Sequence, residues 1–252
     1  MLNKNSVYAA LTLALAAHSA SFAQDAADDS SPWSGDFSAG YLSSSGNTDD
    51  TTADFNFDVK YQPKPWGHQF KGRAYGTSSS NVTTAESYKL GWKSTYDFTE
   101  FNYAFGAVDW NKDRFAAYKQ QTFATVGYGR RFLNSDTFVL NAEIGVGYAE
   151  QKPSDRPPSL PAPTEKNAVG TLGGDFLWNF SENAAFEQTL YVFSSSENTY
   201  LESVSKVTAG LVGNVGLVLS YTIKKNTDLP AGAAVGTDKT DTLTSLSLNY
   251  SF

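Results

Sequence analysis

The 252-residue chain contains no cysteine and only two histidines, His18 and His68. The absence of cysteine excludes a disulfide framework and thiolate chemistry. Basic residues are also scarce, because 19 Lys and Arg stand against 26 Asp and Glu, which gives a formal net charge of -7. An acidic chain has no general attraction for a phosphate backbone, so nucleic acid is not an expected partner.

Long apolar runs are missing as well, since no stretch of about 18 apolar residues is available to form a transmembrane helix. Near the N-terminus, Lys4 precedes a mostly apolar stretch from Val7 to Ala17, and Ser21-Phe22-Ala23 follows. This order is typical of a secretory signal peptide that is cut after Ala23. The expected parts of the chain are a signal peptide (1–23), a short disordered segment (24–32) and a single domain (33–252).

What the chain has instead is an alternation of apolar and polar residues. In the clearest run, from Ala53 to Tyr61, five apolar or aromatic residues share one parity and Asp, Asn and Lys share the other. A period of two residues indicates a strand with one apolar face. Such runs continue from Trp33 to a last strand that ends on Phe252 itself. They predict an all-β fold, a transmembrane antiparallel up-and-down β-barrel of about 12 strands, preceded by a cleavable signal peptide.

The parity is not clean everywhere. Tyr103, Phe105 and Ala107 share one parity, but Val108 and Trp110 take the other, which predicts a β-bulge near Ala107. In the run 186–193 the two parities compete, and the lipid-facing side stays undecided.

The connections between the runs alternate between short and long. The short ones are Gln62–Gly67, Thr99–Asn102, Leu133–Asp136, Ser181–Asn183 and Gly213–Asn214. The long ones are Ser43–Asp50, Thr77–Thr84, Asn111–Lys119, Gln151–Lys166, Ser194–Tyr200 and Lys225–Lys239. Outer-membrane barrels have short periplasmic turns and longer external loops, so both chain ends are expected on the periplasmic side. A soluble antiparallel sandwich is the alternative fold, but it does not require this alternation.

Aromatic residues near the predicted periplasmic strand ends match the interfacial girdle of a membrane barrel. They are Trp33, Tyr61, Trp66, Phe98, Trp178, Phe180 and Tyr250. The apolar faces carry no charged residue, and a charge at mid-depth would cost about 2–4 kcal/mol.

Charged residues fall on the opposite parity, which faces the lumen of the predicted barrel. They are Asp36, Asp54, Asp58, Lys60, Lys71, Arg73, Lys89, Lys93, Glu143, Asp175, Glu187 and Lys206. The hairpin register predicts that Asp58 lies near Lys71 or Arg73. Opposite charges could cross-brace a nearly filled interior, or they could line a narrow aqueous pore. Four glycines on the same parity would either widen such a channel or permit barrel curvature. They are Gly127, Gly129, Gly145 and Gly147.

Several short segments, in their order and spacing, resemble those of a known family. They are Trp33-Ser34-Gly35, Gly40-Tyr41, Ser44-Ser45-Gly46-Asn47-Thr48, Asp113-Arg114-Phe115, Gly127-Tyr128-Gly129-Arg130 and Gly145-Val146-Gly147-Tyr148. From Trp33 to Phe252 the chain is similar to the YdiY-like family of salt-induced outer-membrane proteins, a domain of unknown function. The resemblance implies an outer-membrane barrel and supplies no catalytic residues.

No catalytic, cofactor or metal site is expected. Enzymatic barrels mostly use a histidine at the external rim, whereas His18 leaves with the signal peptide and His68 directly follows a predicted periplasmic turn. Neither Asp49-Asp50 nor the pair Asp238 and Asp241 has the spacing of a calcium loop. The expected partners are outer-membrane lipids and the barrel-assembly machinery, which recognises a terminal strand ending on an aromatic residue.

Three functions therefore stand open for a protein of the bacterial outer membrane. The first is a non-enzymatic barrel that contributes to envelope function or to salt and osmotic adaptation. The second is a small-solute or ion channel, and the third is a lipid-modifying enzyme at the rim.

Overall fold

A computed structural model describes residues 31–44, 49–154, 163–230, 233 and 236–252. The expected signal peptide and most of the segment 24–32 lie outside the described residues. Among the described residues, no helix is long and apolar enough to cross a membrane. The strands are β1 (Trp33–Ser44), β2 (Asp50–Tyr61), β3 (Trp66–Ser79), β4 (Val82–Asp97), β5 (Asn102–Asp113), β6 (Tyr118–Asn134), β7 (Phe138–Pro153), β8 (Glu165–Ser181), β9 (Ala184–Ser194), β10 (Thr199–Val212), β11 (Val215–Asn226) and β12 (Thr240–Ser251).

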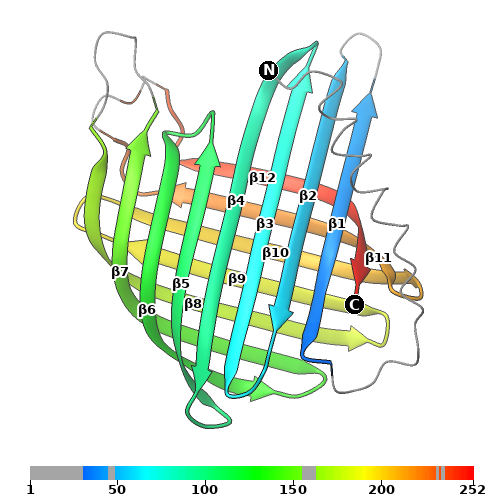
Figure 1. Cartoon of the computed structure of the whole chain (residues 1–252). Helices are drawn as coiled ribbons and strands as arrows, with labels where there is room; N and C mark the ends of the chain where they lie inside the picture. The colour runs from blue at the N-terminus through cyan, green and yellow to red at the C-terminus, as the bar shows by residue number, and fades with distance from the viewer. Residues whose placement is uncertain (1–30, 45–48, 155–162, 231–232, 234–235) are drawn as a thin grey trace.

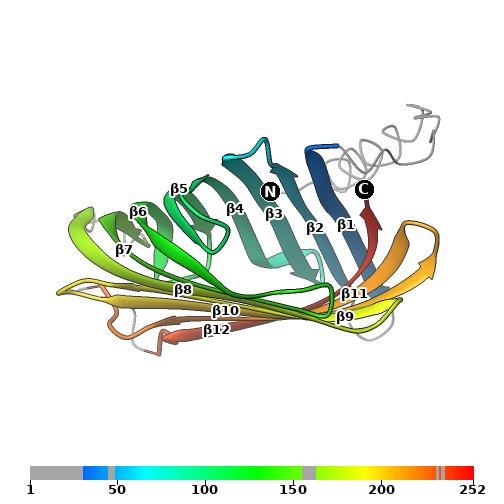
Figure 2. The same cartoon turned by 90° about the horizontal axis from the view of Figure 1, so that it is seen from below.

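The strands form one closed antiparallel barrel in which each strand pairs with its neighbours in sequence and β1 pairs with β12 (Figure 1). The predicted all-β, up-and-down barrel is confirmed. Its cross-section is flattened rather than round, because β1–β5 form one layer and β8–β12 form a second layer that faces it (Figure 2). The chain passes from one layer to the other through β6 and β7. Side chains of the two layers therefore meet across the lumen.

The outer face is apolar along most strands. Val146, Ile144 and Leu246 point outward and remain more than half exposed, with exposed fractions of 65%, 60% and 58%. A water-facing surface of this composition would be unfavourable, whereas hydrocarbon solvates it. The predicted aromatic residues come together on this face near the strand ends. The ring centroids of Trp33 and Tyr61 are 4.4 Å apart.

The parity predicted for β5 is wrong. The ladder from β4 through β5 to β6 contains no register shift within Asn102–Lys112, so no bulge lies at Ala107. Tyr103 and Phe105 face the lumen and are buried, while Val108 faces outward with 42% of its surface exposed. The structure also decides which parity of β9 faces outward, because Leu190 is exposed on the outside and Phe193 is buried inside.

The strict alternation of short and long connections is also wrong: the β5–β6 connection (114–117) is no longer than the turn 98–101 before it, and the β3–β4 connection is shorter still. β3 and β4 stay paired as far as Ser79 and Val82, so only Ser80 and Asn81 connect them. Both residues have positive φ angles, 48° and 64°, as a two-residue hairpin turn requires. The predicted loop Thr77–Thr84 is therefore mostly strand. We call the end where β1 begins and β12 finishes the terminal end, and the opposite end the loop end.

Two single substitutions to arginine, at neighbouring residues of β10, test which face of the barrel contacts lipid. Val207 is exposed on the outer face, whereas Thr208 lines the internal cavity. Val207→Arg should abolish most refolding into lipid vesicles, because a charge on the lipid face at mid-depth costs about 2–4 kcal/mol. Thr208→Arg should refold close to the wild-type level. Heat-modifiable mobility on a denaturing gel measures the folded fraction, and equal fractions for the two variants would contradict the face assignment.

Candidate functional site

The lumen contains a cavity of about 530 Å³ whose wall is built from both layers. Ten of the twelve charged residues named from the sequence line it: Asp36, Asp58, Lys60, Lys71, Arg73, Lys89, Lys93, Glu143, Glu187 and Lys206. The other two also point inward. Asp54 is buried against Arg73, and Asp175 accepts a hydrogen bond from Thr189 at 3.3 Å. The structure thus gathers all of these charges inside the barrel.

Two ion pairs reach across the lumen from β4, one to the opposite layer and one to the connecting strand β7. The Lys89 ammonium on β4 contacts the Glu202 carboxylate on β10, and the Lys93 ammonium on β4 contacts Glu143 on β7. Both carboxylates are buried, and Tyr103 also donates a hydrogen bond to Glu143 at 2.7 Å. A buried carboxylate that loses its cation keeps its desolvation cost, so these pairs hold β4 against β10 and β7.

Arg73 makes a third connection across the lumen. Its guanidinium binds both oxygens of Asp54 at 3.0 and 2.9 Å, which fixes the planar group beside β2. The same group donates to the hydroxyls of Thr222 at 3.2 Å and Ser245 at 3.4 Å. One side chain of β3 thereby joins β2 to β11 and β12. Near the loop end, Lys224 on β11 lies 3.6 Å from Asp113 on β5 and makes a fourth connection across the lumen.

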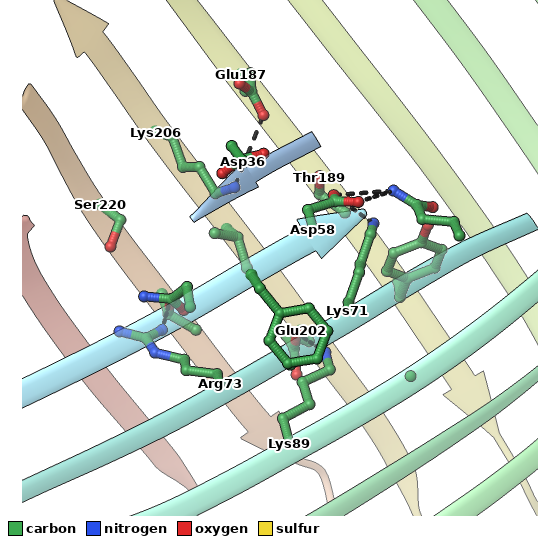
Figure 3. A pocket seen from close by; sticks show the side chains of 18 of the residues that line it. Asp36, Asp58, Lys71, Arg73, Lys89, Glu187, Thr189, Glu202, Lys206 and Ser220 are labelled. Atoms are coloured by element: carbon green, nitrogen blue, oxygen red, sulfur yellow. Dashed lines mark hydrogen bonds and ion pairs between the residues drawn. The ribbon is translucent and has the colours of Figure 1, made fainter. Parts of the chain in front are cut away.

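Other charges pair along one wall and stay accessible to the cavity (Figure 3). Asp58 lies 3.8 Å from Lys71, the partner that the hairpin register predicts. On the opposite layer, Lys206 lies 3.8 Å from Glu187. Figure 3 shows Asp36 beside this second pair. The longer distances and higher exposure leave these amines and carboxylates available to a solute or to water.

An aromatic cluster fills the lumen on the side of β6 to β10. Phe123 stacks on Phe193 with ring centroids 4.3 Å apart and on Tyr200 at 5.6 Å. Ala149 and Val169 complete this buried cluster. Phe193 of this cluster also lines the cavity, so the rings form part of its wall.

The inward-facing glycines of β6 make room for aromatic rings rather than for a channel. A β-carbon built on Gly129 would lie 2.2 Å from Cζ of Tyr103, and one on Gly127 would lie 2.7 Å from the ring of Phe105. The two rings of β5 therefore lie directly on the glycine backbone of β6. At Gly127 and Gly129, aromatic rings occupy the space that the missing side chains leave.

Three functional-site residues were missed by the sequence reasoning. Asp109 lines the cavity, and its lumen parity was readable from its apolar neighbours Val108 and Trp110. Gly91 leaves space for it, since a β-carbon there would lie 2.9 Å from the Asp109 carboxylate. Glu202 and Lys224 follow the alternation of β10 and β11, so their lumen parity was readable, although their partners across the barrel were not.

The cavity wall is nearly balanced in charge. Its acidic residues are Asp36, Asp58, Asp109, Glu143, Glu187 and Glu202. Its basic residues are Lys60, Lys71, Arg73, Lys89, Lys93, Lys206 and Lys224. Such a wall favours neither anions nor cations strongly, and it suits small solutes that carry both charges or strong hydrogen-bonding groups.

The described residues include one histidine, His68. No group of three or more His, Asp or Glu side chains among them could hold a metal ion. His68 lies on the outer face, where its ring stacks between Tyr61 at 6.3 Å and Trp66 at 6.4 Å. It therefore belongs to the aromatic girdle and lies away from the charged lumen.

A family model described as "Protein of unknown function, DUF481" matches residues 37–252. The chain belongs to this family. One relative is "Uncharacterized protein YdiY" of Escherichia coli (strain K12). It is 31% identical over 227 residues, which cover 90% of this chain and 86% of the relative. The resemblance inferred from short segments is confirmed.

Solved barrels resemble the chain in architecture. The NanC porin is 12% identical, with a TM-score of 0.45 over 86% of this chain and 97% of the porin. The translocator domain of the autotransporter NalP from Neisseria meningitidis is 10% identical, with a TM-score of 0.46 over 98% of both chains. The KdgM porin is 9% identical, with a TM-score of 0.43 over 87% of this chain and 99% of the porin. These similarities concern the barrel alone and extend to no solute or partner.

Removing one member of a cross-lumen pair should destabilise the barrel. Glu202→Gln leaves the Lys89 ammonium without its carboxylate, and breaking a buried pair costs about 3 kcal/mol. The double variant Lys89→Met with Glu202→Met should recover most of that loss, because no unpaired charge remains. Urea unfolding in lipid vesicles measures the free energies. Additive losses in the double variant would show that the two side chains do not interact.

Filling the glycine surface under Tyr103 should also lower stability. Gly129→Val would force the ring and the new side chain apart, and overpacking of this kind costs about 1–3 kcal/mol. Gly170→Val is the matched control, because no atom lies within 4 Å of its β-carbon position. The free energy of unfolding in urea should fall for Gly129→Val only. An equal fall in both variants would mean that the ring does not lie against β6.

Proposed function

We propose that the protein is a non-enzymatic barrel of the bacterial outer membrane that contributes to envelope function or to salt and osmotic adaptation, with a lumen braced shut against free axial flow. The observation that carries this proposal is the set of contacts that cross the lumen. The pair Lys89–Glu202 joins opposite walls, Lys93–Glu143 joins β4 to β7, and Arg73 joins β2 to β11 and β12. The proposed adaptive role comes from the family resemblance.

Closure has two physical sources in this proposal. The ion pairs occupy the cross-section with long side chains whose charges are mutually neutralised. The aromatic cluster around Phe123 excludes water from the remaining side. A hydrated ion would have to separate buried pairs or displace stacked rings, and both are unfavourable. The twelve charges named from the sequence act here as structural braces and as the surface of an internal chamber.

Residence in the outer membrane is supported by the apolar outer face and its aromatic girdle. The signal peptide expected over residues 1–23 would deliver the chain to the periplasm. The terminal strand β12, which pairs with β1 and leads to Phe252, would present its aromatic end to the barrel-assembly machinery. Membrane lipids are then the principal surroundings of the mature protein.

A small-solute channel is the second candidate. It is favoured by the cavity of about 530 Å³ and by accessible groups such as Lys71 and Glu187 on its wall. Under this alternative the same charges line a conducting path. A rim enzyme has less support, because His68 stacks within the girdle near the terminal end.

Conductance measurements in planar bilayers distinguish a closed lumen from a conducting channel. Wild-type protein should give no discrete current steps at moderate salt. Replacing both bracing pairs together, through Lys89→Ser, Lys93→Ser, Glu143→Ser and Glu202→Ser, removes four long side chains without leaving an unpaired charge among them. This variant should show stepwise conductance, because the opened cross-section admits water and ions.

A pair at the rim provides the control. Arg114 and Glu86 lie 3.2 Å apart near the loop end and do not line the cavity. Arg114→Ser with Glu86→Ser should leave the protein silent in bilayers. Discrete steps from wild-type protein, reproduced across preparations, would reject the closed lumen and favour the channel.

A further inference from the structure

The closure of the barrel between β1 and β12 is incomplete. The two strands pair at only four positions, from Asp36 opposite Ser251 to Ala39 opposite Leu248. Residues Gly40–Ser44 of β1 and Thr240–Ser247 of β12 continue as strand, yet they have no register partner in each other. Both views show β12 lying in the second layer and curving toward β1 only near its C-terminal end (Figures 1 and 2).

Other pairs of described strands leave overhangs only where the partner strand has ended, as at Val82–Glu86 of β4 and Glu165–Val169 of β8. β10 and β11 pair from Tyr200 opposite Asn226 to Val212 opposite Val215. Open sheet edges are strongly disfavoured in hydrocarbon, because their N–H and C=O groups find no partner among lipid tails. The unmatched segments of β1 and β12, which we call the half-seam, therefore need either water or a polar ligand.

The inner side of the half-seam is polar and opens on the cavity. Ser245 and Ser247 of β12 line the cavity, as does Arg73, which donates to Ser245. Ser247 is 4% exposed, and its hydroxyl has no hydrogen-bond partner within the described chain. It lies beside Gly40, whose β-carbon position is 2.7 Å from that oxygen and 2.5 Å from the main-chain oxygen of Leu246, so the two strands still touch at this end of the half-seam. A buried hydroxyl without a partner indicates a missing hydrogen-bonding group at this place.

The same opening is bordered by two leucines on the lumen-facing parity. Leu42 has the lumen-facing parity of β1, yet 73% of its surface is exposed, since β12 does not cover it. Leu243 has the lumen-facing parity of β12 and lines the cavity. Apolar residues on the inner face are expected to contact something apolar, and neither has a neighbouring strand across the half-seam.

We propose that the half-seam is a lateral portal between the membrane and the lumen, and that it takes an amphipathic, lipid-like ligand with an acyl chain. The chain would lie along Leu42 and Leu243. The head would accept hydrogen bonds from Ser247 and from the neighbouring Arg73 and Ser245. A peptide strand fits less well, because the two edges diverge and a guest strand could pair with only one of them. This inference goes beyond the proposed function and requires no axial conduction.

Disulfide cross-linking tests whether the half-seam is open, and the cysteine-free chain gives no background. Phe37→Cys with Tyr250→Cys is the control, since these residues are paired. Ser43→Cys with Thr244→Cys would be opposite each other if the register continued. The control pair should oxidise readily, and the second pair at least about tenfold more slowly, because separated Cα atoms cannot be bridged. Both are compared in folded, heat-modifiable protein. Equal rates would overturn the portal.

Photolabelling of wild-type protein tests the ligand. A diazirine-bearing palmitic acid in phosphatidylcholine vesicles should label the peptides that contain Leu42 and Leu243 more strongly than the outer wall at Val146. Leu42→Asn should lose the label at Leu243, whereas Val82→Asn, at an equally exposed valine of the β3–β4 hairpin, should keep it. Uniform labelling around the barrel would overturn the assignment. A polypeptide co-purifying on the half-seam, with no label there, would also overturn it.

Discussion

A strand that crosses hydrocarbon must have its main-chain hydrogen bonds satisfied by other strands, and the whole barrel depends on this constraint. Closing the sheet into a barrel satisfies these hydrogen bonds. It also gives every strand one row of side chains that faces outward and one that faces inward. The outer parity must be apolar, so charged residues can remain only inside. Once inside, away from bulk water, each charge requires a partner. Many of the charges inside this barrel are consequently held in ion pairs.

The direction of those pairs shapes the molecule. Pairs along one wall, such as Asp58 with Lys71, leave the barrel free to be round. Pairs across the lumen, such as Lys89 with Glu202, bring β4 within side-chain reach of β10. These pairs and the stacked rings around Phe123 lie between the two facing layers seen in Figure 2. The inward polar residues thus determine the shape of the barrel as well as its lining.

The alternation in the sequence was sufficient to predict the barrel, its strand number and the inward parity of most charges, because lipid imposes a period of two on each strand separately. It failed at β5, where Tyr103 and Phe105 are aromatic residues that face inward onto Gly127 and Gly129. Their environment depends on a neighbouring strand. The partner of Lys89 was likewise unreadable, since it is set by how two distant walls face each other.

Flattening also places a sharp bend at each edge of the barrel, and the two edges respond differently. Around β6 to β8, glycines such as Gly145 and Gly173 allow the bend, and β7 and β8 stay paired from Phe138 to Gln151. At the opposite edge, β1 and β12 separate after Ala39. A side wall that cannot curve must unpair, and the residues exposed there include Leu42. The bracing of the lumen and the portal at the half-seam are therefore two consequences of one flattened barrel.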